Sequence, residues 1–164
     1  MNPILHQITG FIESIGIRVV FGAIETDCFL PGITIEQGAL YVDADKLGYP
    51  GDLLHEAGHI AVVPLAERES LNAASIAARK DHAAEEMMAI AWSFAASRHL
   101  NIDPLVVFHE HGYKGGGKAL ADSFVEGRVV GLPMLQYVGL TYDPKTAFAQ
   151  NTQPYPHMQR WTRA

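Results

Sequence analysis

Two histidines and a glutamate stand inside an otherwise apolar stretch, as His55-Glu56-Ala57-Gly58-His59 within GDLLHEAGHIAVV. On an α-helix, residues four positions apart lie one above the other on the same face. His55 and His59 could therefore each direct an imidazole nitrogen at one tetrahedral metal ion, as the H-E-x-x-H pattern encodes. Glu56 lies about 100° further round such a helix, so it cannot ligate beside them. Its carboxylate could instead accept the proton of a metal-activated water that attacks a carbonyl.

A second interpretation of this stretch is a core helix that carries two imidazoles by coincidence. Such a helix would bury two histidines and a glutamate without obvious partners, at a cost of several kcal/mol unless they are paired or bind metal. The metal site is therefore the favoured hypothesis, and zinc is the expected ion. Cys28 is the single cysteine, which excludes a cysteine-based zinc site and favours a small buried hydrophobic role for this residue.

A catalytic zinc site usually has three protein ligands, so a third must come from elsewhere in the chain. Position 65, where a third histidine would complete one known pattern, is Leu65. Glu85 and Glu86 follow His59 by 26 and 27 residues, near the start of an expected helix over 81–99. Glu85 lies nearer the apolar stripe of that helix, whereas Glu86 shares its face with small residues that would let two helices approach. The sequence leaves both glutamates open as ligands.

Other polar residues could support such a site. Asp81 and His82 stand one turn before the glutamates and could orient an imidazole, or they could cap the helix. In FHEHGYKGGGKA, His109 or Tyr113 could donate a hydrogen bond to an oxyanion, and the glycines could form a mobile lid. The same stretch could equally be an ordinary glycine-rich turn.

The composition is that of a globular domain. The chain has 164 residues, of which 48% are hydrophobic and 18% charged. A net charge of −6 gives no general attraction to nucleic acid or to anionic membranes. The N-terminus lacks the pattern of a signal peptide, and no apolar run approaches the length of a membrane span. A single cysteine fits a reducing compartment, so we expect a cytoplasmic protein.

Periodicity predicts an α+β fold. The expected helices are 3–16, the motif helix from a cap at Asp52 to just before Pro64, 81–99, 120–126 and one more within 131–140. Residues 17–22 predict a strand, and residues 28–48 predict a hairpin that turns at Gln37-Gly38. We expect a small twisted, mostly antiparallel sheet packed on the motif helix and on a second ligand-bearing helix, with further C-terminal helices. Residues 1–142 would form this single domain, followed by a polar, proline-containing and loosely held tail over 143–164.

The HEAGH motif and a downstream glutamate resemble the gluzincin branch of the zincin metallopeptidases, and the compact layout is closest to the ImmA/IrrE-like peptidases. The resemblance covers about residues 10 to 97. It implies that His55, His59 and Glu86 bind zinc and that Glu56 is the general base. The segment after Glu86 departs from the family pattern, because it lacks an asparagine and carries Phe94-Ala95 further along.

The expected function is therefore zinc-dependent cleavage of a peptide or protein substrate, and the resemblance extends this to transcriptional regulators. The alternative is a zincin-like module that binds metal or a partner without turnover, and the third option is a helical protein with a coincidental motif. If the fold is right, the strand ALYVD before the motif helix would form the edge of the cleft, where a peptide could add as an antiparallel strand.

Overall fold

A computed structural model describes residues 2–164 and confirms the α+β class. The described residues form seven α-helices, α1 (Pro3–Ser14), α2 (Asp52–Ala61), α3 (Ala73–Ala77), α4 (His82–His99), α5 (Gly117–Val125), α6 (Leu132–Tyr137) and α7 (Pro144–Ala149). They also form three strands, β1 (Val19–Phe21), β2 (Ile33–Glu36) and β3 (Ala39–Val42), and three 3-10 helices, η1 (Leu65–Ser70), η2 (Pro104–Val106) and η3 (Tyr113–Gly115).

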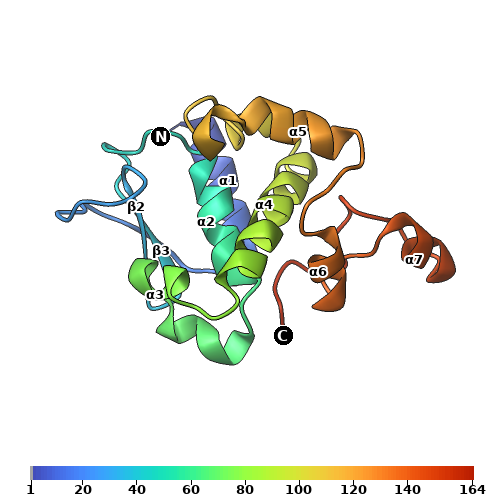
Figure 1. Cartoon of the computed structure of the whole chain (residues 1–164). Helices are drawn as coiled ribbons and strands as arrows, with labels where there is room; N and C mark the ends of the chain where they lie inside the picture. Colours follow the sequence, from blue (N-terminus) through green and yellow to red (C-terminus); the bar gives the residue numbers. More distant parts are fainter. Residues whose placement is uncertain (1) are drawn as a thin grey trace.

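The motif helix α2 occupies the centre of the molecule. Figure 1 shows α2 between the sheet and α4, with α1 behind it and α5 crossing above the upper ends of α2 and α4. Most of α2 is buried, and Leu53, Leu54 and Ile60 are within 1% of complete burial. Because α2 is covered on several sides, its polar residues must be paired or serve a site.

The sheet is mixed, with strand order β1-β3-β2. β3 pairs in parallel with β1 and antiparallel with β2. The predicted hairpin is confirmed, and its turn residues Gln37 and Gly38 have φ values of 48° and 67°, as a two-residue type I′ turn requires. The prediction that ALYVD forms an edge was wrong, because β3 has a neighbour on each side.

The two helices α2 and α4 approach each other closely at Gly58. A Cβ atom at this position would lie 2.9 Å from the carbonyl oxygen of Ala89 and 3.1 Å from its Cα atom. The small residues predicted to bring the helices together do so, and side chains on the facing sides of α2 and α4 can therefore meet.

The start of α2 differs from the prediction. Asp52 is the first residue of the helix, and Gly51 precedes it as a cap without a side-chain bond. A Cβ atom at Gly51 would lie 2.0 Å from the carbonyl oxygen of Val106, so a larger capping residue cannot occupy this place. The carboxylate of Asp52 is left for another partner. Asp81 precedes α4 and likewise makes no side-chain capping bond.

The C-terminal residues pack against the core, contrary to the expectation of a loosely held tail. Trp92 Nε1 donates to the carbonyl of Trp161 at 2.8 Å, and the Tyr155 hydroxyl donates to the carbonyl of Ala91 at 2.8 Å. The backbone N–H of Arg163 donates to the carbonyl of Ala61 at the end of α2, at 2.9 Å. A few contacts, most of them from aromatic residues, thus hold a mostly polar segment against α2 and α4.

Cys28 is only half-buried, whereas a buried hydrophobic position was expected for it.

The Gly58 contact yields a stability prediction. In the variant Gly58→Ala, the new methyl group meets the backbone of Ala89, so the free energy of unfolding should fall by about 1–3 kcal/mol. Gly10, in the middle of α1, is the matched control, because it is exposed and no other described atom lies within 4 Å of an added Cβ. Gly10→Ala should stabilise the protein by about 0.5–1 kcal/mol. Urea denaturation of both variants measures the difference, and equal stability of the two would contradict the tight contact.

Candidate metal centre

His55 and His59 lie on one face of α2 with their rings converging. Their Nε2 atoms are 3.2 Å apart, and the two rings meet nearly at right angles. The His55 side chain is 14% exposed and the His59 side chain 7%. The prediction that the helix brings both imidazoles together is confirmed.

Glu86 reaches the same point from α4. Its Oε1 atom lies 3.4 Å from Nε2 of His55, and its Oε2 atom lies 2.9 Å from Nε2 of His59. The Glu86 side chain is 37% exposed, so one side of this cluster faces solvent. The structure thus brings His55 and His59 together with Glu86, one of the two glutamates that the sequence left open as ligands.

Glu85 has a different role. It is buried, and the Arg79 guanidinium binds it with two hydrogen bonds, from Nε at 2.7 Å and from Nη2 at 3.0 Å. Arg79 also donates to Glu67 at 2.9 Å. The carboxylate of Glu85 is thus paired with Arg79, and Glu86 is the glutamate that contacts the imidazoles.

The spacing of the three side chains fits a zinc ion. Two ligands at about 2.0–2.1 Å from a tetrahedral zinc are separated by about 3.3 Å. The two imidazole Nε2 atoms are 3.2 Å apart, which is close to this value, and a different oxygen of Glu86 lies 3.4 Å from that of His55 and 2.9 Å from that of His59. Two imidazole nitrogens and a carboxylate oxygen also form a donor set that zinc prefers in catalytic sites.

The charges at the cluster favour a cation. Burial opposes ionisation of Glu86, but hydrogen bonds with His55 and His59 outweigh it and hold the pKa of Glu86 well below its usual range. Burial works to lower the pKa of His55, but the hydrogen bond with Glu86 and the charge of Glu56 outweigh it and raise that pKa. Positive charge is thus stabilised where the three side chains meet, and a metal ion would compete with protons for that place.

Glu56 stands beside the cluster and is left free. One of its carboxylate oxygens lies within 4.8 Å of a ring nitrogen of His55 and of His59. The prediction that Glu56 cannot ligate beside the two histidines was therefore wrong, because its carboxylate is close enough to take the place of Glu86. We favour Glu86, because both of its oxygens contact the imidazoles. Across residues 2–164, Glu56 makes no side-chain hydrogen bond or ion pair, so its carboxylate is available as a base.

Of the three residues that could support the site, Tyr113 contacts a ligand imidazole, whereas His109 and His82 do not. The Tyr113 hydroxyl lies 3.3 Å from Nδ1 of His55, on the side of the ring opposite Nε2. His109 pairs with Asp52 at 2.7 Å rather than with an imidazole of the cluster. His82 is half-buried, and its Nδ1 atom has no hydrogen-bond partner among the described residues.

Two contacts near the site were not predicted from the sequence: Asp52 with His109, and Arg79 with Glu85. Asp52 lies one turn before His55 on the same helix, and this spacing could have marked Asp52 as a residue that supports the site. The side chain of Arg79 gave no signal, because its pairing with Glu85 depends on how the chain folds between α3 and α4.

The chain matches no protein-family model, no curated protein and no solved structure. Within residues 2–164, no helix combines the length and the apolarity that crossing a bilayer requires. Inferences about function therefore depend on the geometry of the site.

The separate environments of the two glutamates yield a prediction. Glu85→Gln breaks a buried ion pair with Arg79 and should lower the free energy of unfolding of the metal-free protein by roughly 3 kcal/mol. Glu86→Gln removes a carboxylate that is 37% exposed, and because solvent weakens its pairing with the imidazoles, the loss of stability should be smaller than in Glu85→Gln. Thermal unfolding without metal measures both, and a larger loss in Glu86→Gln would show that the roles are reversed.

Proposed function

We propose that the protein is a zinc-dependent metallopeptidase in which His55, His59 and Glu86 hold the metal and Glu56 is the general base. One observation carries this proposal. Both oxygens of Glu86 reach the two imidazole nitrogens, while the neighbouring carboxylate of Glu56 remains unpaired among the described residues. This division gives the site a base in addition to a ligand set, and a purely structural metal site needs no base.

The chemistry follows from the positions of these side chains. A bound zinc ion supplies a Lewis acid that acidifies a water molecule and polarises a carbonyl group. Glu56 would accept a proton from the attacking water on its carboxylate and then deliver that proton to the nitrogen of the leaving amine. Glu86, held ionised by the imidazoles, would remain a ligand rather than a proton acceptor.

Tyr113 has a supporting part in this proposal. Burial, followed by the negative charges of Glu86 and Asp52, raises the pKa of Tyr113 well above its usual range, so the hydroxyl stays protonated. Its oxygen can accept a hydrogen bond from Nδ1 of His55 when Nε2 binds metal. Tyr113 would therefore orient a ligand rather than donate to an oxyanion, the role that the sequence suggested.

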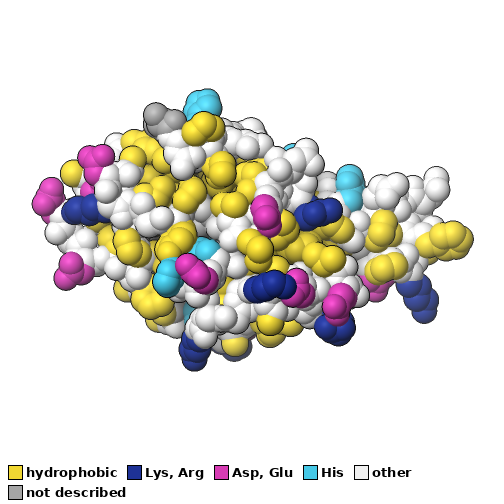
Figure 2. Space-filling view, turned by 90° about the horizontal axis from the view of Figure 1, so that it is seen from above, with side chains coloured by type: hydrophobic (Ala, Val, Ile, Leu, Met, Phe, Trp, Pro, Cys, Tyr) yellow, Lys and Arg dark blue, Asp and Glu magenta, His cyan; other side chains and the backbone are white. Residues whose placement is uncertain are grey.

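A peptide or protein is the proposed substrate, and a regulatory protein is the class suggested by the resemblance to ImmA/IrrE-like peptidases. A peptide that binds by strand addition would use the free edge of β1 or β2, because β3 is flanked on both sides. In Figure 2, apolar side chains occupy much of the drawn face. The Lys and Arg side chains of the described residues lie at separate places on this face and form no continuous patch. This surface, together with a net charge of −6, supports a peptide more than a nucleic acid, and the single cysteine supports the cytoplasm.

The metal content tests the ligand assignment. Purified wild-type protein should bind about one zinc ion per chain, and His55→Ala, His59→Ala and Glu86→Gln should each weaken zinc binding by more than about 100-fold. Glu56→Gln is the matched control on the same helix and should retain zinc. Equilibrium dialysis with zinc measures these affinities, and unaltered binding by Glu86→Gln would remove this residue from the ligand set.

The activity of the zinc-loaded protein tests the assignment of the base. Glu56→Gln should lower the cleavage rate of a peptide library by at least about 100-fold, because a general base contributes that much or more. Its zinc content should stay at the wild-type level. Undiminished cleavage by Glu56→Gln would refute the role of Glu56. A zinc-loaded wild type that cleaves no peptide would favour the non-hydrolysing module instead.

A further inference from the structure

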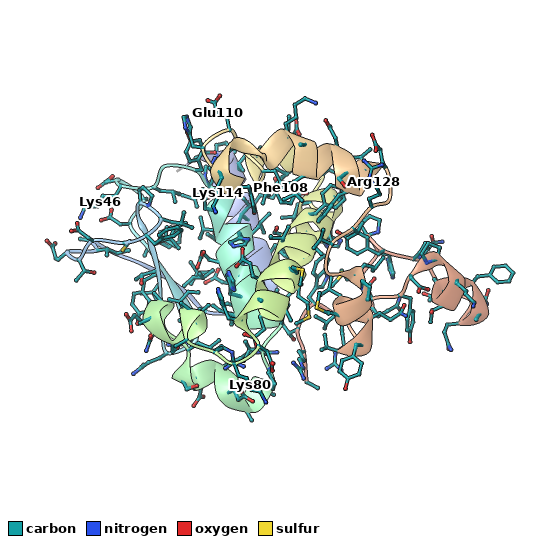
Figure 3. All side chains as sticks on the ribbon, viewed as in Figure 1. Lys46, Lys80, Phe108, Glu110, Lys114 and Arg128 are labelled. Atoms are coloured by element: carbon teal, nitrogen blue, oxygen red, sulfur yellow. The ribbon has the colours of Figure 1, made fainter. Side chains whose placement is uncertain are left out.

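Residues 108–117 form a closed strap over the first turn of α2. At its two ends, a Cβ atom on Gly117 would lie 2.5 Å from the carbonyl oxygen of Phe108 and 2.7 Å from that of His109. Phe108 is buried and anchors the strap against Phe94 and Phe124. Figure 3 shows the part that carries Phe108, Glu110 and Lys114 near the upper ends of α2 and α4.

His109 fixes the strap to α2. Its Nε2 atom lies 2.7 Å from Oδ1 of Asp52, and both side chains are almost fully buried, at 10% and 11% exposure. The His109 ring stacks on Tyr49 with 3.7 Å between ring centroids and an angle of 10° between their planes. Gly112 also packs on this ring, since an added Cβ would lie 3.4 Å from its Cε1 atom. His109 therefore has a single well-defined position.

Tyr113 emerges from the strap in a strained conformation. Tyr113, Lys114 and Gly115 have φ values of 53°, 55° and 81°, which places three successive residues in the left-handed region. The two residues with side chains each cost about 1–2 kcal/mol there. Surrounding contacts must impose this conformation. Its result is that the Tyr113 ring packs between Phe108 and His55, with its hydroxyl 3.3 Å from Nδ1 of His55.

We propose that Asp52 and His109 are positioning residues that act through Tyr113 on His55. Asp52 and His55 lie one turn apart on α2, and the strap connects them through His109 and Tyr113. This series of contacts, from Asp52 through the strap to His55, fixes the rotation of the His55 ring, so that Nε2 stays directed at Glu86 and His59. The effect on metal binding rests on the proposed function, whereas the effect on the ring of His55 does not.

The test measures whether His109 works through Tyr113. The variants are Tyr113→Phe, which removes only the hydroxyl, His109→Phe, which keeps a ring to stack on Tyr49, and the double variant. His109→Gln retains a donor for Asp52 and is the conservative variant. His111→Phe is the matched control, because His111 lies in the same strap but is 65% exposed. If His109→Phe alone does not fold, adding Asp52→Leu replaces the buried pair by two apolar side chains.

Titration with Co²⁺, followed by its visible absorption, gives the first result. Tyr113→Phe and His109→Phe should each weaken Co²⁺ binding by about 10-fold, as loss of a group that orients a ligand typically does. The double variant should bind Co²⁺ no more weakly than whichever single variant binds it less tightly. His109→Gln and His111→Phe should bind Co²⁺ like wild type. Effects that multiply in the double variant, or unaltered binding by Tyr113→Phe, would overturn the proposal.

The ¹⁵N signals of the His55 ring in the metal-free protein give a second result. His109→Phe should shift these signals in the same direction as Tyr113→Phe, and His111→Phe should leave them unchanged. Unshifted His55 signals in His109→Phe would overturn the positioning role. If wild-type protein binds neither Co²⁺ nor Zn²⁺, the proposed function fails, and the ring signals alone decide whether Asp52 and His109 position Tyr113.

Discussion

The contact between Gly58 of α2 and Ala89 of α4 is the constraint on which the site depends. It brings the backbones of two helices so close that a single methyl group would not fit between them. At that separation a glutamate side chain on α4 spans the gap to both imidazoles on α2. A larger residue at Gly58 would separate the helices and move Glu86 away from His55 and His59. The small residue inside the motif is thus part of what positions Glu86 at the histidines.

The acidic residues around α2 are divided among distinct partners. Glu85 is neutralised by Arg79, Asp52 is paired with His109, and Glu86 meets the two imidazoles. The first two pairings leave Glu85 and Asp52 unavailable to a metal ion at the imidazoles. Glu56 is the acid beside the imidazoles that is left without a partner in the described part of the chain. In the proposed metal centre, this division would leave Glu86 as a ligand and Glu56 as a base.

Part of the fold and of the candidate site could be predicted from local features of the sequence. The spacing of His55 and His59 and the hairpin turn at Gln37-Gly38 depend on residues close in the chain, and both predictions are confirmed. The choice between Glu85 and Glu86 could not be made, because it depends on where Arg79 lies in the folded chain.

Features that depend on distant segments were also missed. The hairpin pattern contains no information on the parallel pairing of β1 with β3, so β3 was wrongly placed at an edge. The tail was judged by its polar composition, although the half-buried Trp161 packs against Trp92 and Phe11 and helps to hold the segment in place.

The zinc K-edge X-ray absorption spectrum of the zinc-loaded protein tests the central claim most directly. A site made of His55, His59 and Glu86 predicts nitrogen and oxygen neighbours at about 2.0–2.2 Å, with outer-shell scattering from two imidazoles. In Glu86→Gln the oxygen contribution should change while the scattering of two imidazoles persists. A spectrum with one imidazole or with more than two, or a first shell that does not respond to Glu86→Gln, would contradict the proposed metal centre.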